Sequence, residues 1–326
     1  MEFQILISNL TNPTLLFFVL GIFAVIVKSD LEIPSSSSKF ISLYLLFSIG
    51  FKGGQELSHS GFTTEIVYSL MFGGAIASII PLYTFFILKR RMSISDAGAV
   101  AATYGSVSAV TFVAAVSFLE AQKTNYGGHM VAVMALMESP AIIMGVILLI
   151  KFDSEDSSKG KLTETIKHSF TNGSVLMILG SLIIGLIADT KQAEGIKPFT
   201  TDIFKGFLAI FLLEMGMVTA RRFSAFKKYG WFATVFAILI PLINGCIVAA
   251  LSGLFVNGPG NRFIFAILAA SASYIAVPAA MRLAAPKADP GLYIPMALGI
   301  TFPFNITVGM PLYYLIVQNF GNTIST

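Results

Sequence analysis

Ten apolar segments, joined by short polar loops, run through this chain from end to end. A bilayer offers no water to exposed backbone groups, so an apolar segment of about 20 residues crosses it as an α-helix. Only 12% of the residues are charged, against roughly 25% in soluble domains. We therefore expect an all-α membrane protein with about ten transmembrane helices. The expected segments cover residues 13–27, 39–57, 64–88, 95–119, 127–150, 170–188, 203–221, 230–256, 262–284 and 291–317.

The distribution of Lys and Arg predicts how these helices are oriented. Most of the 21 basic residues lie in loops after the odd-numbered segments, such as Lys89-Arg90-Arg91. Because basic loops stay in the cytoplasm, we expect both termini outside it, in a cell inner membrane. The net charge of +4 then reflects topology, and we expect the lipid bilayer and no nucleic acid as a partner. The single cysteine, Cys246, excludes an internal disulfide and a cysteine metal site.

The ten segments divide into two halves of five. A unit with an odd number of spans, repeated in tandem, enters the membrane from opposite sides, so such a repeat is inverted. Landmarks recur in the same order and at similar spacing: Leu46–Phe51 beside Leu212–Met217, and Met134–Leu136 with Pro140 beside Met296–Leu298 with Pro303. We expect a first repeat over residues 1–151, a polar cytoplasmic linker over 152–167, and a second, inverted repeat over 168–326.

The fourth and ninth segments each contain a Ser-x-Ser motif in the middle of an apolar run. One is Gly105-Ser106-Val107-Ser108 and the other is Ala270-Ser271-Ala272-Ser273. Ser and Thr let a membrane helix unwind because they can bond the freed backbone groups. Small residues also line ordinary helix interfaces, but interrupted segments at corresponding positions of two halves are typical of a transporter's binding site. We therefore expect two broken helices.

These breaks indicate the kind of substrate. A helix that begins inside the membrane presents free backbone N–H groups and the positive end of its dipole. Two such starts that face each other form an anion site without a buried Lys or Arg, and the serine hydroxyls add donors. The sequence therefore indicates a small anion. A neutral polar substrate would use the same groups less well.

Glu138 lies deep in the fifth segment, directly before Ser139 and Pro140. Proline removes a backbone donor, which leaves a carbonyl one turn earlier free. A carboxylate beside free carbonyls is a candidate Na⁺ or H⁺ site, so we assign the coupling ion, Na⁺, to Glu138 and expect no other cofactor. The alternative is a protonated Glu138 in a helix interface. Glu214, in the seventh segment, is a second membrane acid that can titrate.

Uncharged polar residues at membrane depth can supply further oxygen ligands for the ion. Asn305 and Thr307 lie in the tenth segment, at the position that mirrors Glu138. The expected ion-coupling residues are Glu138, Thr103, Thr301 and Asn305. Each uncharged member can instead join helices by hydrogen bonds.

The sequence argues against an enzyme. A serine nucleophile needs a base, and we place no His or Lys at membrane depth beside the Ser-x-Ser motifs. The His-Glu-x-x-His motif of metalloproteases is missing. A channel or a sensor with a transporter fold remains an alternative, although broken helices in an inverted repeat favour alternating access.

Several motifs together point to a known family. The most specific is Gly105–Thr111, which reads Gly-Ser-Val-Ser-Ala-Val-Thr and is similar to a GAVSGST pattern. Others are Asn12–Leu15 (like SPTL), Ile49–Gly54 (like IGLTGG), Leu119–Lys123 (like LEESK), Met137–Ala141 (like MDIPA), Met215–Met217 (like MGM) and Ala269–Ser273 (like AASSS). In these motifs the chain resembles, over nearly its whole length, the SbtA-type sodium-dependent bicarbonate symporters.

The resemblance implies a ten-helix inverted repeat with a core and a gate domain, assembled as a homotrimer. It implies bicarbonate uptake with Na⁺ by an elevator motion, with bicarbonate between the broken helices and Glu138 at the family's acidic position. Some members bind a PII-like regulator on the cytoplasmic side, which is a candidate partner here. The expected substrate-binding residues are Gly105, Ser106, Ser108, Thr111, Ser271, Ala272, Ser273 and Tyr274.

One stretch departs from the family. After the second Ser-x-Ser the family has Asp-Ile-Ser-Gly-Pro-Pro, whereas this chain has Tyr274-Ile275-Ala276-Val277-Pro278-Ala279. It therefore lacks an acid and a serine beside the expected site. The hypothesis is a Na⁺-coupled importer of a small anion, with bicarbonate as the first candidate. H⁺ coupling and another small carboxylate are the alternatives within transport.

Overall fold

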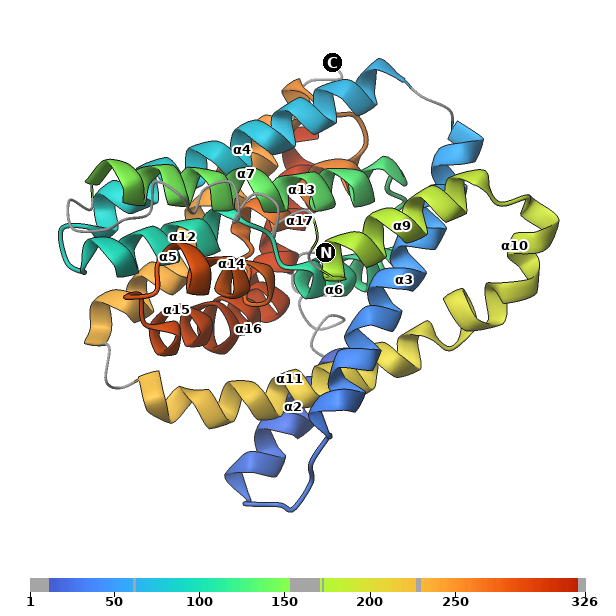
Figure 1. Ribbon diagram of the computed structural model, residues 1–326. Helices are drawn as coiled ribbons and strands as arrows, with labels where there is room; N and C mark the ends of the chain where they lie inside the picture. Colours follow the sequence, from blue (N-terminus) through green and yellow to red (C-terminus); the bar gives the residue numbers. More distant parts are fainter. Residues whose placement is uncertain (1–11, 61–62, 153–170, 172, 227–229, 322–326) are drawn as a thin grey trace.

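The computed structural model describes residues 12–60, 63–152, 171, 173–226 and 230–321 (Figure 1). Within these residues every regular element is a helix and no strand occurs. The predicted linker, residues 152–167, lies outside the described residues apart from Phe152. The all-helical class that the apolar segments predict is therefore confirmed for the described chain.

The helices of the first half are α2 (Pro13–Ile26), α3 (Ser35–Ser60), α4 (Thr64–Leu88), α5 (Ile94–Gly105), α6 (Ala109–Ala121) and α7 (His129–Phe152). The second half continues with α9 (Gly173–Ile187), α10 (Thr190–Lys197), η2 (Pro198–Asp202), α11 (Phe204–Phe226), α12 (Gly230–Leu251), η3 (Ser252–Leu254), α13 (Pro259–Ala270) and α14 (Ala276–Ala284). It ends in one helical run with two π-helical stretches: α15 (Pro290–Met296), η4 (Ala297–Thr301), α16 (Phe302–Phe304), η5 (Asn305–Gly309) and α17 (Met310–Gly321).

Six helical runs in the described residues are long and apolar enough to cross a membrane: Thr64–Leu88, Ile94–Ala121, His129–Phe152, Thr190–Arg221, Gly230–Leu254 and Pro290–Phe320. Helices α2 and α9 are apolar but shorter. Helix α3 carries Lys39, Lys52 and Glu56, and the ninth predicted segment is divided into α13 and α14. The chain is thus a multi-pass membrane protein, and the full count of ten spans stays a prediction.

Four helices pack in two pairs beside the others. Helix α2 packs on α11, and α3 packs on α9. We call α2, α3, α9 and α11 the panel, and α4 to α7 with α12 to α17 the bundle. In Figure 1 the panel runs along the lower right of the molecule and the bundle fills the upper left.

Glycines let the paired panel helices touch through their backbones. A Cβ atom added at Gly216 of α11 would collide with the carbonyl of Phe18 in α2, and one added at Gly21 of α2 would collide with the carbonyl of Leu213. Small residues at membrane helix interfaces permit this close approach. In lipid the hydrophobic effect does not drive helices together, so van der Waals contact between them stabilises the pair. The α2–α11 pair is therefore a closely packed unit.

Replacing Gly216 with valine is expected to force α2 and α11 apart and to lower the free energy of unfolding by about 1–3 kcal/mol, the usual cost of overpacking. Gly206 lies on the same helix, and a Cβ added there meets nothing within 4 Å. Gly206→Val is therefore the matched control: it makes the same change in helix propensity on α11 without a collision. Thermal unfolding of the detergent-solubilised protein measures both, and equal losses of Tm would contradict the close contact.

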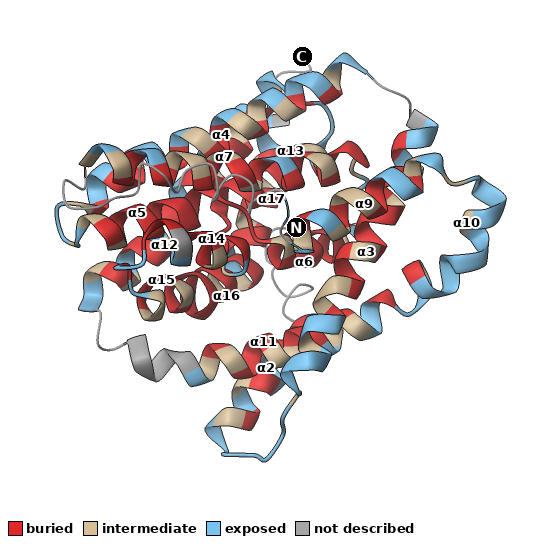
Figure 2. Cartoon of the chain, in the orientation of Figure 1, coloured by how far each residue is buried: buried red, intermediate tan, exposed pale blue. Residues whose placement is uncertain are grey.

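The bundle buries its broken helices. In the most apolar stretch of Ile94–Ala121, 89% of the residues are buried, against 39% in Thr64–Leu88. Figure 2 shows the same concentration of buried residues on α5, α6, α13 and α14. Non-helical backbone at membrane depth is tolerated only inside protein or beside a water-filled cavity, and the fold places both breaks inside.

Candidate functional site

Both buried helices are interrupted at the Ser-x-Ser motifs. Helix α5 ends at Gly105 and α6 begins at Ala109, while α13 ends at Ala270 and α14 begins at Ala276. The serines that follow the two first halves adopt nearly the same extended conformation. Ser106 has φ −84° and ψ 168°, and Ser271 has φ −83° and ψ 168°. The breaks lie where the sequence predicts them, and both begin with a serine in the same extended conformation.

The second serine of each motif accepts a hydrogen bond from a backbone N–H in the first turn of the helix that restarts. The Ser108 hydroxyl oxygen accepts a hydrogen bond from the Thr111 N–H at 3.1 Å. The Ser273 hydroxyl oxygen accepts one from the Val277 N–H at 3.4 Å. Ser108 is the N-cap residue of α6, a position that serine favours because its oxygen bonds an N–H that the first turn leaves free. Ser273 lies two residues before Ile275, the N-cap residue of α14. The motif thus explains how two helices begin inside the protein.

The two breaks bond to each other. The Ser108 N–H donates to the Ser271 hydroxyl oxygen at 3.0 Å, and the Ser273 N–H donates to the Thr103 carbonyl at 2.9 Å. Each break therefore satisfies backbone groups of the other, as buried polar groups require. The starts of α6 and α14, each with the positive end of its dipole, are brought together at one place.

A cavity of about 20 Å³ lies at this place, between the breaks, α7 and the panel. Its wall includes Ser108, Ser273, Tyr274 and Glu138, together with Leu46 and Ile178 of the panel. A volume of this size holds about one water molecule. The structure therefore brings four of the predicted site residues together around a space with room for about one water molecule.

Tyr274 extends from the second break toward the panel. Its hydroxyl lies 4.0 Å from the Met215 sulfur of α11. Its ring meets Phe302 edge-on, with ring centres 6.4 Å apart. The residue that departs from the family pattern thus lies on the cavity wall, between the bundle and α11.

Glu138 lines the cavity from α7. Pro140 lies two residues further along the same helix. Within the described residues its carboxylate has no hydrogen bond or ion pair, while the neighbouring Ser139 is buried. A membrane carboxylate is costly unless it binds a proton, a cation or a donor. Its position beside the breaks is the one that an ion-coupling residue needs.

Three buried oxygens around the breaks have no partner among the described residues: Thr103 Oγ1, Ser106 Oγ and Asn305 Oδ1. The Asn305 amide is oriented by its Nδ2, which donates to the Ala270 carbonyl at 2.7 Å. Such groups in a native protein call for an explanation, and a bound ion is one. Thr103 and Asn305 thus offer free acceptor oxygens close to the first halves of the two broken helices.

Thr301, the remaining member of the predicted ion-coupling set, is already engaged. Its hydroxyl donates to the Ala237 carbonyl at 2.8 Å and pairs with the Tyr104 hydroxyl at 2.8 Å. The other predicted substrate residues are buried in or beside the breaks without lining the cavity: Gly105, Ser106, Thr111, Ser271 and Ala272.

Two residues that the sequence did not single out for the site support the breaks. Tyr104 holds the last turn of α5 to Thr301. Asn244 of α12 donates to the Ala269 carbonyl at 3.3 Å, at the end of α13, and accepts from Tyr83. The only signal for Tyr104 is its place beside Gly105. Asn244 carries no local signal beyond a polar residue at membrane depth.

His129 is not among the residues that line this cavity. His129 Nε2 lies 3.4 Å from the hydroxyl of Ser69, on α4. Among the described residues, no group of three or more His, Cys, Asp or Glu could hold a metal ion.

Comparison with models of protein families gives a match. The family model of the Na⁺-dependent bicarbonate transporter superfamily matches residues 13–318. A search of curated proteins found no match. The matched region covers nearly the whole chain and includes both breaks, Glu138 and the panel.

Proposed function

Since the chain belongs to the Na⁺-dependent bicarbonate transporter superfamily, we propose that it is a secondary active transporter. It uses a Na⁺ gradient to take up a small anion, with bicarbonate as the first candidate. The observation that carries this proposal is the meeting of two helix starts at one cavity that also has Glu138 on its wall. The chain is a transporter by family, and an enzymatic role is not part of the proposal.

The anion binds between the breaks in this proposal. It accepts hydrogen bonds from the hydroxyls of Ser108 and Ser273 and from the first N–H groups of α6 and α14. Those groups now bond within the protein, so the anion replaces contacts such as Ser108 N–H to Ser271. Because the cavity measures only about 20 Å³, the panel and the bundle separate here to admit it.

The cation binds to oxygens beside the same site. Glu138 supplies a charged oxygen on the cavity wall, and Thr103 and Asn305 supply the neutral oxygens that lack partners. Oxygen donors are what Na⁺, a hard cation, requires. With the anion and Na⁺ both bound, the charges offset each other, which lowers the cost of carrying the loaded site through an apolar environment.

An inverted repeat accounts for the pairing of the panel helices. The first panel helix of each half packs on the second panel helix of the other: α2 on α11, and α9 on α3. The two breaks likewise exchange hydrogen bonds. A pseudo-twofold axis in the membrane plane produces such an exchange. We propose repeats over residues 1–151 and 168–326, with the panel as the gate domain and the bundle as the core domain of an elevator.

The assembly and location follow from the family resemblance. We propose a homotrimer in the inner membrane with both termini outside the cytoplasm. A PII-like regulator on the cytoplasmic side is a further candidate partner.

Ligand-dependent thermal stability tests the substrate and the coupling ion. A ligand that binds only the folded state raises Tm by mass action. Bicarbonate is expected to raise the Tm of the purified protein in sodium chloride and much less in choline chloride at the same pH. A shift of equal size in both salts would favour H⁺ coupling, and a shift with acetate or formate but not bicarbonate would overturn the substrate.

A further inference from the structure

Two open cavities lie along the seam between α6 of the bundle and helices α3 and α11 of the panel. One open cavity of about 420 Å³ is lined by residues that include Lys52 and Glu120. Another of about 540 Å³ is lined by residues that include Ser117 and Lys205. Both cavities are open at the surface of the described chain, whereas the paired panel helices touch through glycine backbones. The seam thus leaves space between the bundle and the panel.

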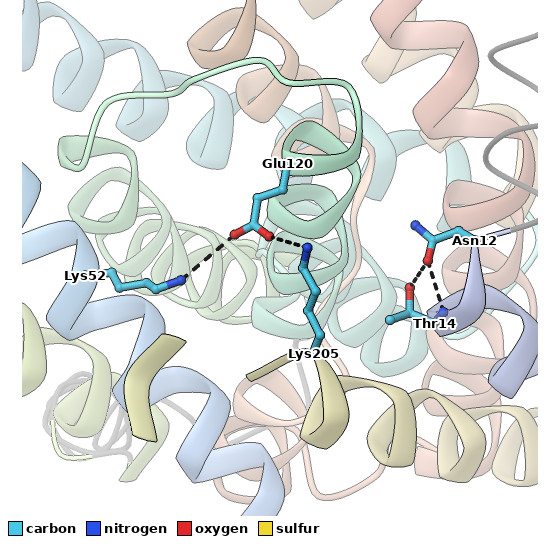
Figure 3. A network of polar contacts seen from close by, with 5 residues as sticks. All are labelled: Asn12, Thr14, Lys52, Glu120 and Lys205. Carbon is cyan, nitrogen blue, oxygen red and sulfur yellow. Dashed lines mark hydrogen bonds and ion pairs between the residues drawn. The ribbon is translucent and has the colours of Figure 1, made fainter. Parts of the chain in front are cut away.

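An ion-pair cluster bridges this seam at Glu120, the second-last residue of α6 (Figure 3). The Lys205 ammonium of α11 lies 3.2 Å from one carboxylate oxygen of Glu120. The Lys52 ammonium of α3 lies 3.9 Å from the other. Lys52 is also positioned 5.4 Å from the centre of the Phe204 ring. One residue of the bundle thus contacts two helices of the panel.

The arrangement and exposure of the charges make this contact reversible. Lys52 and Lys205 come from different helices and repel each other, and the Glu120 carboxylate lies between them (Figure 3). The side chains of Lys52 and Glu120 are about one-third exposed, so water and salt weaken each pair. Such a cluster biases a position without locking it, unlike a buried ion pair whose rupture is costly.

Helix α6 connects this cluster with the site. It has 13 residues, a rod of about 20 Å, with Glu120 at one end and the Ser108 cap at the other. A helix that is held at Glu120 cannot tilt or slide freely at Ser108. The position of the first break relative to the panel therefore depends on whether the cluster is formed.

We infer that Glu120 is a positioning residue, the anionic centre of a clamp that holds α6 against the panel and opens when the bundle moves. The inference rests on the proposed function, because the bundle moves only as part of the proposed transport cycle. It names the contacts that must break at the α6–α3–α11 seam before the Ser108 end of α6 can shift.

Thiol labelling at Ser117 measures the opening directly, without transport. Ser117 lies on α6 one turn before Glu120, is 5% exposed and lines the seam cavity with Lys205. Cys246 is the single cysteine, so Cys246→Ala with Ser117→Cys gives one reporter thiol. We expect Glu120→Gln and Lys205→Gln each to speed its reaction with a membrane-impermeant thiol reagent severalfold. The double variant should react no faster than the faster single one, because partners in one interaction are not additive.

Glu56→Gln is the matched control, because Glu56 is an acid on the wall of the Lys52–Glu120 cavity and no ion pair to it is found within the described residues. It should leave the labelling rate unchanged. Added choline chloride should raise the labelling rate of the protein with Glu120 intact, because salt screens the ion pairs. It should have little effect on the labelling rate of Glu120→Gln, which has lost those pairs. Equal rates in all variants, or additive effects of Glu120→Gln and Lys205→Gln, would overturn the clamp.

Uptake kinetics separate the clamp from a general structural role. Glu120→Gln should change the maximal rate of anion uptake and leave the apparent KM within about twofold, and Glu120→Asp should restore part of the rate. A loss of affinity with an unchanged maximal rate would contradict positioning at the seam. Because labelling needs no substrate, a failed transport assay would leave the labelling result intact and would count against the proposed function alone.

Discussion

Replacing the second serine of both motifs, Ser108→Ala with Ser273→Ala, should nearly abolish anion binding. Each hydroxyl bonds a backbone N–H in the first turn of a half-helix, and each serine lies on the cavity wall. A hydrogen bond to a charged group contributes about 1.5–3 kcal/mol, so each single substitution should weaken binding about tenfold to a hundredfold. Binding is measured by isothermal titration or by ligand-dependent Tm in saturating Na⁺.

A serine on the same helix but outside the site provides the control. Ser117→Ala removes a buried hydroxyl of α6 that does not line the central cavity, so it should leave affinity near that of the unchanged protein. Loss of the Ser108 N-cap also costs about 1 kcal/mol of stability, which the Tm without ligand reports separately. Wild-type affinity in the folded double variant would remove the breaks from the anion site.

Glu138→Gln should eliminate the dependence of anion binding and uptake on Na⁺. The substitution keeps the size of the side chain and removes the negative charge that faces the cavity. A cation loses its charged ligand, and we expect its apparent affinity to fall by at least about tenfold, the effect of roughly 1.4 kcal/mol. Uptake at a series of Na⁺ concentrations measures the change.

The second membrane acid makes this test specific. Glu214 lies in α11 of the panel, and one of its carboxylate oxygens is buried without a partner among the described residues. Glu214→Gln should retain Na⁺ dependence if Glu138 is the ion-coupling residue. Loss of Na⁺ dependence in Glu214→Gln and not in Glu138→Gln would transfer the ion site to the panel.

Much of the helical framework follows from local sequence signals. The ten apolar segments each overlap observed helices, and the Ser-x-Ser motifs mark both breaks. These predictions succeed because hydropathy and N-cap chemistry act within a few residues of the chain. Family membership, which the sequence motifs indicate, is confirmed by the match over residues 13–318.

Other features depend on contacts between distant residues. No local pattern indicates that Ser108 bonds to Ser271, or that Glu120 meets Lys52 and Lys205. The polar stretch before the seventh segment forms helix α10, with an Asp189 cap, although it was expected as a loop. The π-helical turns η4 and η5, which carry Thr301 and Asn305, were likewise not predicted.

The most direct test of coupled transport is uptake of radiolabelled bicarbonate into proteoliposomes, with and without an inward Na⁺ gradient. We expect accumulation above the outside concentration with the gradient, and its collapse when a sodium ionophore dissipates the gradient. A channel or a sensor cannot concentrate its ligand. Equilibration without accumulation, in vesicles whose protein shows the bicarbonate-dependent Tm shift, would contradict a Na⁺-coupled transporter.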